Sequence, residues 1–445
     1  MKAISQFTDP INSKNYVSSS SSAVGAEASD HFNPFITSYE FLSEFVDVSN
    51  SELNKQLRSK DFLQNFKKYF EGIANLNSVQ KRIFAYSTLS NLDSVIDQSL
   101  SSYNNNLVST NQTPHKVLAQ IGETRILHYP AISNETAVSA NYTIPLLMVY
   151  APINRFHILD LSPNRSIVNK FVSAGFDVFI IDWGQEQSKD KFTLSDYIDN
   201  IDQAIELISS ITKREKINLF GFSWGGTLSL IYCALHNSKI KNLILQSSNL
   251  NFDKDDTIIA EWMRNFPIER FSDEFKEIFG HLIDLAFLMR NPVVHSTDRI
   301  KYVLDMREYE IIQFIQNLGK ISSWITNTPD ISSQMFRQFV IDLYQKNLLF
   351  KNELFIEEKE KVKEQREKIP IDLKKITVPV LNIVGSKDDL VSPKSSLPII
   401  DSVASRDNKT IEIPLGHIEL CISYEAHQNL WPQVVDWLQR KSYAN

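Results

Sequence analysis

The sequence predicts an α/β protein built on a mostly parallel sheet. Between residues 144 and 246, apolar stretches with strand character alternate with helix-like segments, and this alternation is typical of parallel sheets. A serine box, Gly221-Phe222-Ser223-Trp224-Gly225, lies between a strand-like run and a helix-like run. An acidic residue and a histidine follow strand-like runs near the end of the chain. These observations predict a sheet that carries a nucleophile at its carboxyl edge.

The first core segment, residues 115–249, supplies most of the predicted sheet. The run at residues 144–150 is apolar on both faces, as a central strand requires. Residues 166–174 read as a helix that ends before Gly175, because glycine commonly follows the last helical turn. The predicted strands are residues 124–129, 144–150, 176–183, 217–220 and 240–246, and the predicted helices are residues 166–174 and 194–211.

The sequence before residue 115 divides into two parts. Residues 1–33 are polar and include a serine run, which predicts a disordered tail. In residues 34–114, apolar side chains recur at helical spacing, as at Phe62, Phe66 and Phe70. We therefore expect an amphipathic helical region whose apolar face packs on this chain, on a partner or on a hydrophobic surface.

The alternation of strands and helices stops after residue 249. Residues 250–370 look helical and rich in aromatic side chains, so we predict a helical cap, inserted in the sheet domain, that roofs the site and moves to admit substrate. The mixed-charge run at residues 357–368 is interpreted as a solvated helix or linker. Residues 371–445 form the second core segment. It has strands predicted at 378–384 and 409–413 and a closing helix at 424–441.

Composition narrows the classes of function. The formal net charge of −7 does not favour nucleic acid as a partner. The two cysteines, Cys233 and Cys421, cannot form a disulfide framework. No secretory leader and no apolar stretch long enough to span a membrane are expected. The sequence has no glycine-rich nucleotide loop and no Cys/His cluster with metal-ligand spacing, so we expect neither a cofactor nor a metal.

The serine box has the context of a nucleophile elbow. In such a turn the residues two before and two after the nucleophile must be small, here Gly221 and Gly225. The turn holds the Ser223 hydroxyl above the strand, and the helix that follows points its free N–H groups at any oxyanion formed there. We expect one oxyanion donor at the backbone N–H of Trp224.

An acid and a histidine complete the pattern. An α/β-hydrolase fold needs Ser, then an acid after a late strand, then His after the last strand. Asp388 and His417 follow Ser223 in that order. His417 would act as general base, and Asp388 would orient it. Asp389 is the competing acid; Asp388 stands closer to the strand end.

The second oxyanion donor is expected in the loop after strand 144–150. Pro152 has no N–H. The candidates are therefore Ile153 and Asn154.

Several longer segments resemble poly(3-hydroxyalkanoate) synthases. The match runs from about residue 140 to 440 and is most similar to the short, class III type of catalytic subunit that works with a second, helical subunit. Residues 1–110 carry no recognisable motif. The segments that carry the resemblance are residues 152–163, 177–184, 193–198, 336–347, 385–391 and 416–418.

The resemblance implies an enzyme on an α/β-hydrolase core with a mobile cap. It implies polymerisation of (R)-3-hydroxyacyl-CoA into a polyester chain, a cytoplasmic location at the surface of polyester granules, and a homodimer, with a second helical subunit as a further partner. The family's box is G-x-C-x-G with cysteine as nucleophile. In this chain Ser223 occupies that position.

The serine changes the energetics of each step. Acyl transfer from the CoA thioester to serine is downhill, and transfer from acyl-serine to a hydroxyl is nearly level, so synthesis remains possible. Serine also depends more on its base, because a thiol ionises at about pH 8.5 and is intrinsically more nucleophilic. Three functions stay open on the sequence: a synthase with a serine nucleophile, a serine esterase or polyester depolymerase on this scaffold, and a granule-associated protein with weak catalysis.

Overall fold

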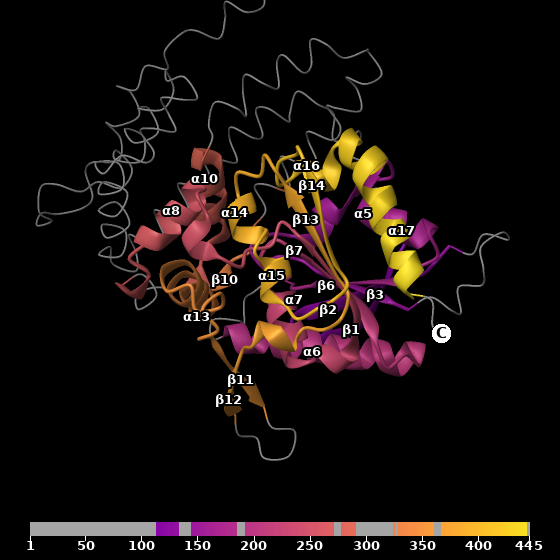
Figure 1. Cartoon of the computed structure of the whole chain (residues 1–445), viewed down its shortest axis with the longest axis horizontal. Helices are drawn as coiled ribbons and strands as arrows, with labels where there is room; N and C mark the ends of the chain where they lie inside the picture. The colour runs from indigo at the N-terminus through magenta and orange to yellow at the C-terminus, as the bar shows by residue number, and fades with distance from the viewer. Residues whose placement is uncertain are drawn as a thin grey trace, which may run out of the picture.

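The computed structural model describes residues 113–132, 144–184, 192–270, 277–290, 324, 328–359 and 366–442. The predicted N-terminal tail and helical region lie outside the described residues, apart from the last two positions. The described chain is organised around an eight-stranded sheet with strand order β1-β2-β6-β3-β7-β8-β13-β14 (Figure 1). From β6 to β14 all neighbouring strands are parallel, and β1 and β2 join antiparallel at one edge. The predicted α/β class with a mostly parallel sheet is confirmed.

The central strands are buried on both faces. Every residue of β3, β7 and β13 is buried, because helices cover both sides of the sheet. In Figure 1, α5 and α17 lie together on one side of the sheet, and α6 and α7 lie on the other. The strands are β1 (Lys116–Ile121), β2 (Thr124–Tyr129), β3 (Leu146–Val149), β6 (Val178–Asp182), β7 (Ile217–Phe222), β8 (Ile240–Gln246), β13 (Val380–Gly385) and β14 (Asn408–Ile413).

The core helices α5 and α6 begin at residues whose side chains cap the first turn. Helix α5 (Ile167–Ser173) starts at Ser166, whose hydroxyl accepts the Asn169 N–H, and Gly175 follows its end with φ of 92°. Helix α6 (Leu194–Thr212) starts with a capping box of Thr193 and Asp196. The other core helices are α7 (Trp224–Leu235), α14 (Pro393–Ser396), α15 (Ile399–Ser402), α16 (Glu419–Ile422), the π-helical turn η9 (Ala426–Leu430) and α17 (Trp431–Ser442).

The segment between β8 and β13 contributes several short helices above the carboxyl edge of the sheet. They are α8 (Ile258–Asn265), α10 (Gly280–Arg290), α13 (Ser333–Gln338) and the π-helix η7 (Phe339–Gln345). The strands β9 (Glu277–Ile278) and β10 (Ile331–Ser332) form a small antiparallel pair beside them. We call this segment the cap.

The interpretation of the charged run at residues 357–368 as a helix or linker is wrong for the part that the structure describes. Strands β11 (Phe355–Lys359) and β12 (Arg366–Pro370) form an antiparallel pair over its described part. Ile356 pairs with Ile369, and Ile356 is buried while Glu357 and Lys368 are exposed. The alternation of apolar and charged residues follows the two-residue period of a strand, which the high charge density concealed.

Two hydrogen bonds fasten the cap to helix α6 and the chain before it. Gln338 Oε1 accepts the N–H of Leu194 at 2.6 Å. The Ser332 hydroxyl donates to the carbonyl oxygen of Phe192, also at 2.6 Å. Within the part of the chain that the structure describes, no helix has the length and apolar character needed to cross a membrane.

Candidate active site

Ser223 occupies a strained turn between β7 and α7. Its φ of 57° and ψ of −128° lie in a region that non-glycine residues rarely adopt. A Cβ on Gly221 would lie 2.5 Å from the Gly226 Cα, and a Cβ on Gly225 would lie 2.3 Å from the Val149 carbonyl oxygen. Because neither position tolerates a side chain, the glycines allow the backbone approach that fixes the serine, as the elbow motif predicts.

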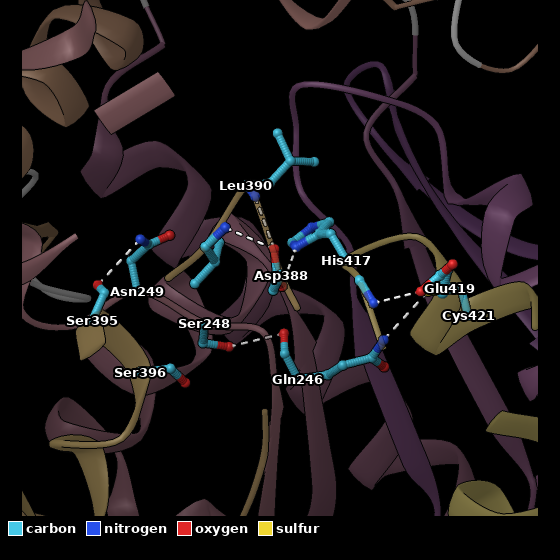
Figure 2. Close-up of polar contacts among 12 residues, drawn as sticks. Gln246, Ser248, Asn249, Asp388, Leu390, Ser395, Ser396, His417, Glu419 and Cys421 are labelled. Atoms are coloured by element: carbon cyan, nitrogen blue, oxygen red, sulfur yellow. Dashed lines mark hydrogen bonds and ion pairs between the residues drawn. The ribbon is translucent and has the colours of Figure 1, made fainter. Parts of the chain in front are cut away.

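The acid loop follows β13 and holds Asp388 in a defined orientation. One carboxylate oxygen, Oδ1, accepts the N–H groups of Leu390 and Val391, both at 2.9 Å. The other, Oδ2, accepts a hydrogen bond from His417 Nδ1 at 2.8 Å (Figure 2). Asp388 is buried and Asp389 is exposed, so the structure brings Asp388, and not the competing acid, to the histidine.

His417 lies in the loop after β14. Glu419 Oε2 accepts the N–H of Gly416 at 2.7 Å, which closes this loop at the start of α16. The imidazole is 5% exposed, and its ring lies 4.9 Å from that of Phe222, the residue before Ser223. Since Asp388 accepts at Nδ1, a neutral imidazole carries its proton there and leaves Nε2 free to accept one.

Ser223 and His417 line the same cavity, which has a volume of about 150 Å³. Among the described contacts there is no hydrogen bond between the Ser223 hydroxyl and the imidazole. Such bonds are often long before substrate binds and shorten in the reacting complex.

The two expected loop donors differ in their surroundings. The backbone N–H of Asn154 donates to the Ala151 carbonyl oxygen at 3.4 Å, and its side-chain oxygen accepts the N–H of Arg155. Asn154 is therefore engaged in its own turn. Both residues line the cavity, so the engagement of the Asn154 N–H is what favours Ile153 as the donor. The N–H of Trp224 stands at the first position of α7, where helix N–H groups lack partners within the helix.

The cavity is predominantly apolar, and the cap supplies half of the residues that line it. Polar groups that line it include those of Tyr150, Trp224 and Tyr344, besides Ser223 and His417. Apolar side chains from α8, α10, α13 and the neighbouring cap residues include Ile259, Met263, Phe266, Leu282, Phe287, Trp324 and Phe336. Such a wall excludes water and suits an acyl chain.

A family model described as the alpha/beta hydrolase fold matches residues 156–419. Proteins named poly(3-hydroxyalkanoate) polymerase subunit PhaC align with most of the chain. The one from Haloarcula marismortui is 33% identical over 75% of this chain and 69% of its own length. The one from Allochromatium vinosum is 32% identical over 67% of this chain and 81% of its own length. The chain belongs to the PhaC family.

A third PhaC relative, from Haloferax mediterranei, is 34% identical over 75% of this chain, and the alignment spans 65% of the relative's length. Among solved structures, a soluble variant of monoglyceride lipase from Saccharomyces cerevisiae covers 76% of this chain and aligns over 98% of its own length, with 14% identity and a TM-score of 0.47. The family model and the strand order of the sheet establish the α/β-hydrolase fold.

Neither cysteine of this PhaC family member lies where it could replace Ser223. Cys233 is fully buried near the end of α7, and burial raises the pKa of its thiol. Cys421 is buried in α16, where its sulfur accepts a hydrogen bond from Gln246, and burial raises its pKa to about 12. Neither thiol ionises readily, and neither lines the cavity.

Sequence reasoning did not single out the groups that hold the acid and the histidine. The N–H donors of Leu390 and Val391 are backbone groups, so their residue types give no sign of them in the sequence. Glu419 left no clear signal either, because Gly416 is not the Ser or Thr with which a capping box begins.

Proposed function

We propose that this chain polymerises (R)-3-hydroxyacyl-CoA through a covalent acyl-enzyme at Ser223. Membership in the PhaC family supports the reaction and its substrate class. The observation that carries the proposal at the site is the Asp388–His417 hydrogen bond, which orients a histidine that lines the same apolar cavity as the serine.

In the first half-reaction the Ser223 oxygen attacks the thioester carbonyl carbon, and His417 Nε2 takes the hydroxyl proton. The N–H groups of Trp224 and Ile153 stabilise the oxyanion. The carbon–sulfur bond then breaks, and the imidazolium returns the proton to the CoA thiolate. Asp388 stabilises the imidazolium and keeps its orientation. The products are acyl-serine and free CoA thiol.

In the second half-reaction a chain-end hydroxyl loses its proton to His417 and attacks the acyl-serine. A new ester forms, and Ser223 leaves with the proton from the imidazolium. An apolar wall supports this step, because it disfavours water as the competing acceptor. Attack by water would instead release a free hydroxy acid, which is the outcome of an esterase or depolymerase.

The assembly and location of the enzyme are proposals of the same kind. The insoluble polyester product supports activity at a granule surface within the cytoplasm. The resemblance to class III subunits supports a homodimer and a second helical subunit as partner. An amphipathic helical region of the kind that the sequence predicts for residues 34–114 would suit either contact.

The decisive assay incubates the full-length protein with (R)-3-hydroxybutyryl-CoA and measures CoA release, polymer and free acid together. Polymer should account for most of the CoA released. Ser223→Ala should lower CoA release at least about 10³-fold and leave thermal unfolding unchanged, because only the nucleophilic oxygen is lost. Ser210→Ala, on the exposed face of α6, serves as control. CoA release with free acid as the product would favour an esterase.

Ser223→Cys separates a synthase from an esterase by a second route. In a synthase the thiolate needs less help from His417, and transfer from thioester to hydroxyl becomes downhill. Polymer formation should therefore persist or rise, while hydrolysis of simple oxygen esters falls. A native serine esterase should lose activity on every substrate. Complete loss in the cysteine variant, together with a wild type that yields only free acid, would exclude the synthase.

A further inference from the structure

Two residues of the cap, Phe339 and Tyr344, contact the indole of Trp224. The ring is 5% exposed and stacks on Phe339, with ring centroids 4.0 Å apart and planes 20° apart. Its Nε1–H donates a hydrogen bond to the Tyr344 hydroxyl at 3.2 Å. The residue that follows the nucleophile therefore has its side chain fixed by two cap residues, while its backbone N–H stands beside Ser223.

The π-helix η7 explains how both cap residues reach one indole. Phe339 and Tyr344 are five residues apart, at the two ends of a segment with i→i+5 hydrogen bonding, as in the bond from Lys346 N–H to the Ile341 carbonyl at 2.9 Å. In this geometry residues five apart come close to one face, whereas an α-helix would turn them well away from each other. The π-helix thus places a stacking ring and a hydroxyl on the same partner.

Tyr344 itself is anchored to the start of the cap segment, shortly after β8, and not only to the cap helices. It is 2% exposed and packs edge-on against Phe252 at 4.8 Å. Just beyond η7, the side chain of Asn347 accepts the N–H of Phe252 and donates to Asn251 Oδ1, both at 3.0 Å. Asn251 and Phe252 lie in the loop and 3-10 turn that come after β8 (Ile240–Gln246), so these contacts tie η7 to the chain that leaves a central strand. Burial also raises the pKa of Tyr344, so the hydroxyl stays neutral.

From these contacts we infer that Tyr344 is a positioning residue for catalysis, which acts through the indole of Trp224 to hold the Trp224 backbone N–H at the oxyanion. The inference rests on the oxyanion role proposed for Trp224. Backbone donors stabilise a transition state only when they are fixed in place before the charge develops. The glycines at positions 221, 225 and 226 have no side chain that could brace the elbow after the nucleophile, and the indole of Trp224 supplies a brace there.

The test compares Tyr344→Phe with wild type on (R)-3-hydroxybutyryl-CoA. The variant keeps the ring contacts and loses only the hydroxyl. We expect kcat to fall about tenfold while KM stays within about twofold, because a displaced oxyanion donor affects the transition state more than substrate binding. Tyr232→Phe is the matched control. It also removes a buried tyrosine hydroxyl that bonds a side chain, Asp202, but on the far part of α7. Its kcat should stay within about twofold of wild type.

A double-mutant cycle distinguishes positioning from general loosening. Trp224→Phe removes the indole donor, so the Trp224→Phe/Tyr344→Phe double variant should lose no more kcat than the worse single variant. Three results would each overturn the inference. They are additive losses of kcat in the double variant, a kcat for Tyr344→Phe within twofold of wild type, and a loss of kcat in Tyr232→Phe equal to that in Tyr344→Phe.

Labelling of Ser223 by a fluorophosphonate separates this inference from the proposed function. The phosphoryl oxygen uses the same donors whatever the natural substrate is, so labelling should slow about tenfold in Tyr344→Phe. If wild type forms no polymer but the labelling rate falls as expected, the polymerase proposal fails and the positioning role stands. If wild type makes polymer but Tyr344→Phe is labelled at the wild-type rate, the positioning role alone fails.

Discussion

The two carboxylate oxygens of Asp388 have separate partners. Oδ1 accepts two backbone N–H groups from its own loop, and Oδ2 accepts His417 Nδ1. The loop bonds fix the carboxylate, so its second oxygen can fix the imidazole. An amide at this position cannot satisfy both sets, because its nitrogen is a donor and would face an N–H on either side.

We therefore expect Asp388→Asn to lower kcat by about 10³ to 10⁴-fold, through the wrong imidazole tautomer. Asp389→Asn makes the same chemical change at the next, exposed residue and should stay within about twofold of wild type. Steady-state CoA release measures both. If Asp389→Asn were the damaging variant, the assignment of the acid would be reversed.

At the scale of elements, the cap helix α10 carries a buried carboxylic acid. Asp284 is 1% exposed, and burial raises its pKa to about 7. Hydrogen bonds with Thr328 lower the pKa, but by less than burial raises it. In the unfolded chain an aspartate titrates near pH 4. The folded protein therefore binds a proton here that the unfolded chain has already lost. The contribution of Asp284 to stability is present at low pH and declines as pH rises from about 4 to about 7.

Asp284→Asn should flatten this decline, because the amide does not titrate. The midpoint of thermal unfolding of wild type should fall relative to that of the variant between pH 5 and pH 7, and the difference should level off above. Asp401→Asn, on the exposed surface, is the control and should follow wild type. Parallel profiles for wild type and Asp284→Asn would show that the acid does not titrate in this window.

At the scale of the whole molecule, the sheet and the cap should differ in how easily they open. The strands β3, β7 and β13 are buried throughout, and Asn347, just beyond η7, is bonded to Phe252 in the chain that leaves β8. Backbone amides of these strands should exchange hydrogen most slowly, those of η7 nearly as slowly, and those of α10 faster. Hydrogen exchange resolved by peptide measures this order. Protection of α10 equal to that of the strands would contradict a cap that opens to admit substrate.

The sheet was largely predictable because its central strands are continuous apolar runs. The predicted strands at 124–129 and 240–246 coincide with β2 and β8. Strand β1 was missed because it lies at the sheet edge, where most of its residues are exposed or partly exposed. The β11–β12 pair was missed because charge density suggested a helix, although the alternation of Ile356 and its neighbours carried the strand signal.

The candidate site was predictable where chemistry is local. Ser223, Asp388 and His417 stand out because each follows a strand in a recognisable motif, and the structure places Asp388 against His417. The sequence leaves Ile153 and Asn154 as alternative donors, because the choice depends on the direction of one backbone N–H. The contact of Trp224 with Tyr344 spans 120 positions and depends on a π-helix, for which the sequence has no simple signature.

The order of the parts along the chain has a consequence for synthesis on the ribosome. Strand β8 pairs with β13, but the whole cap is translated between them. At about 5 to 20 residues per second, the nascent chain carries an unpaired edge of β8 for many seconds. An exposed edge of this kind invites pairing with other chains. Ser223 precedes β8 and has therefore already emerged, but its acid and base follow β13 and β14. The growing polypeptide is therefore inert, and its need for chaperones should be greatest just before β13 leaves the exit tunnel.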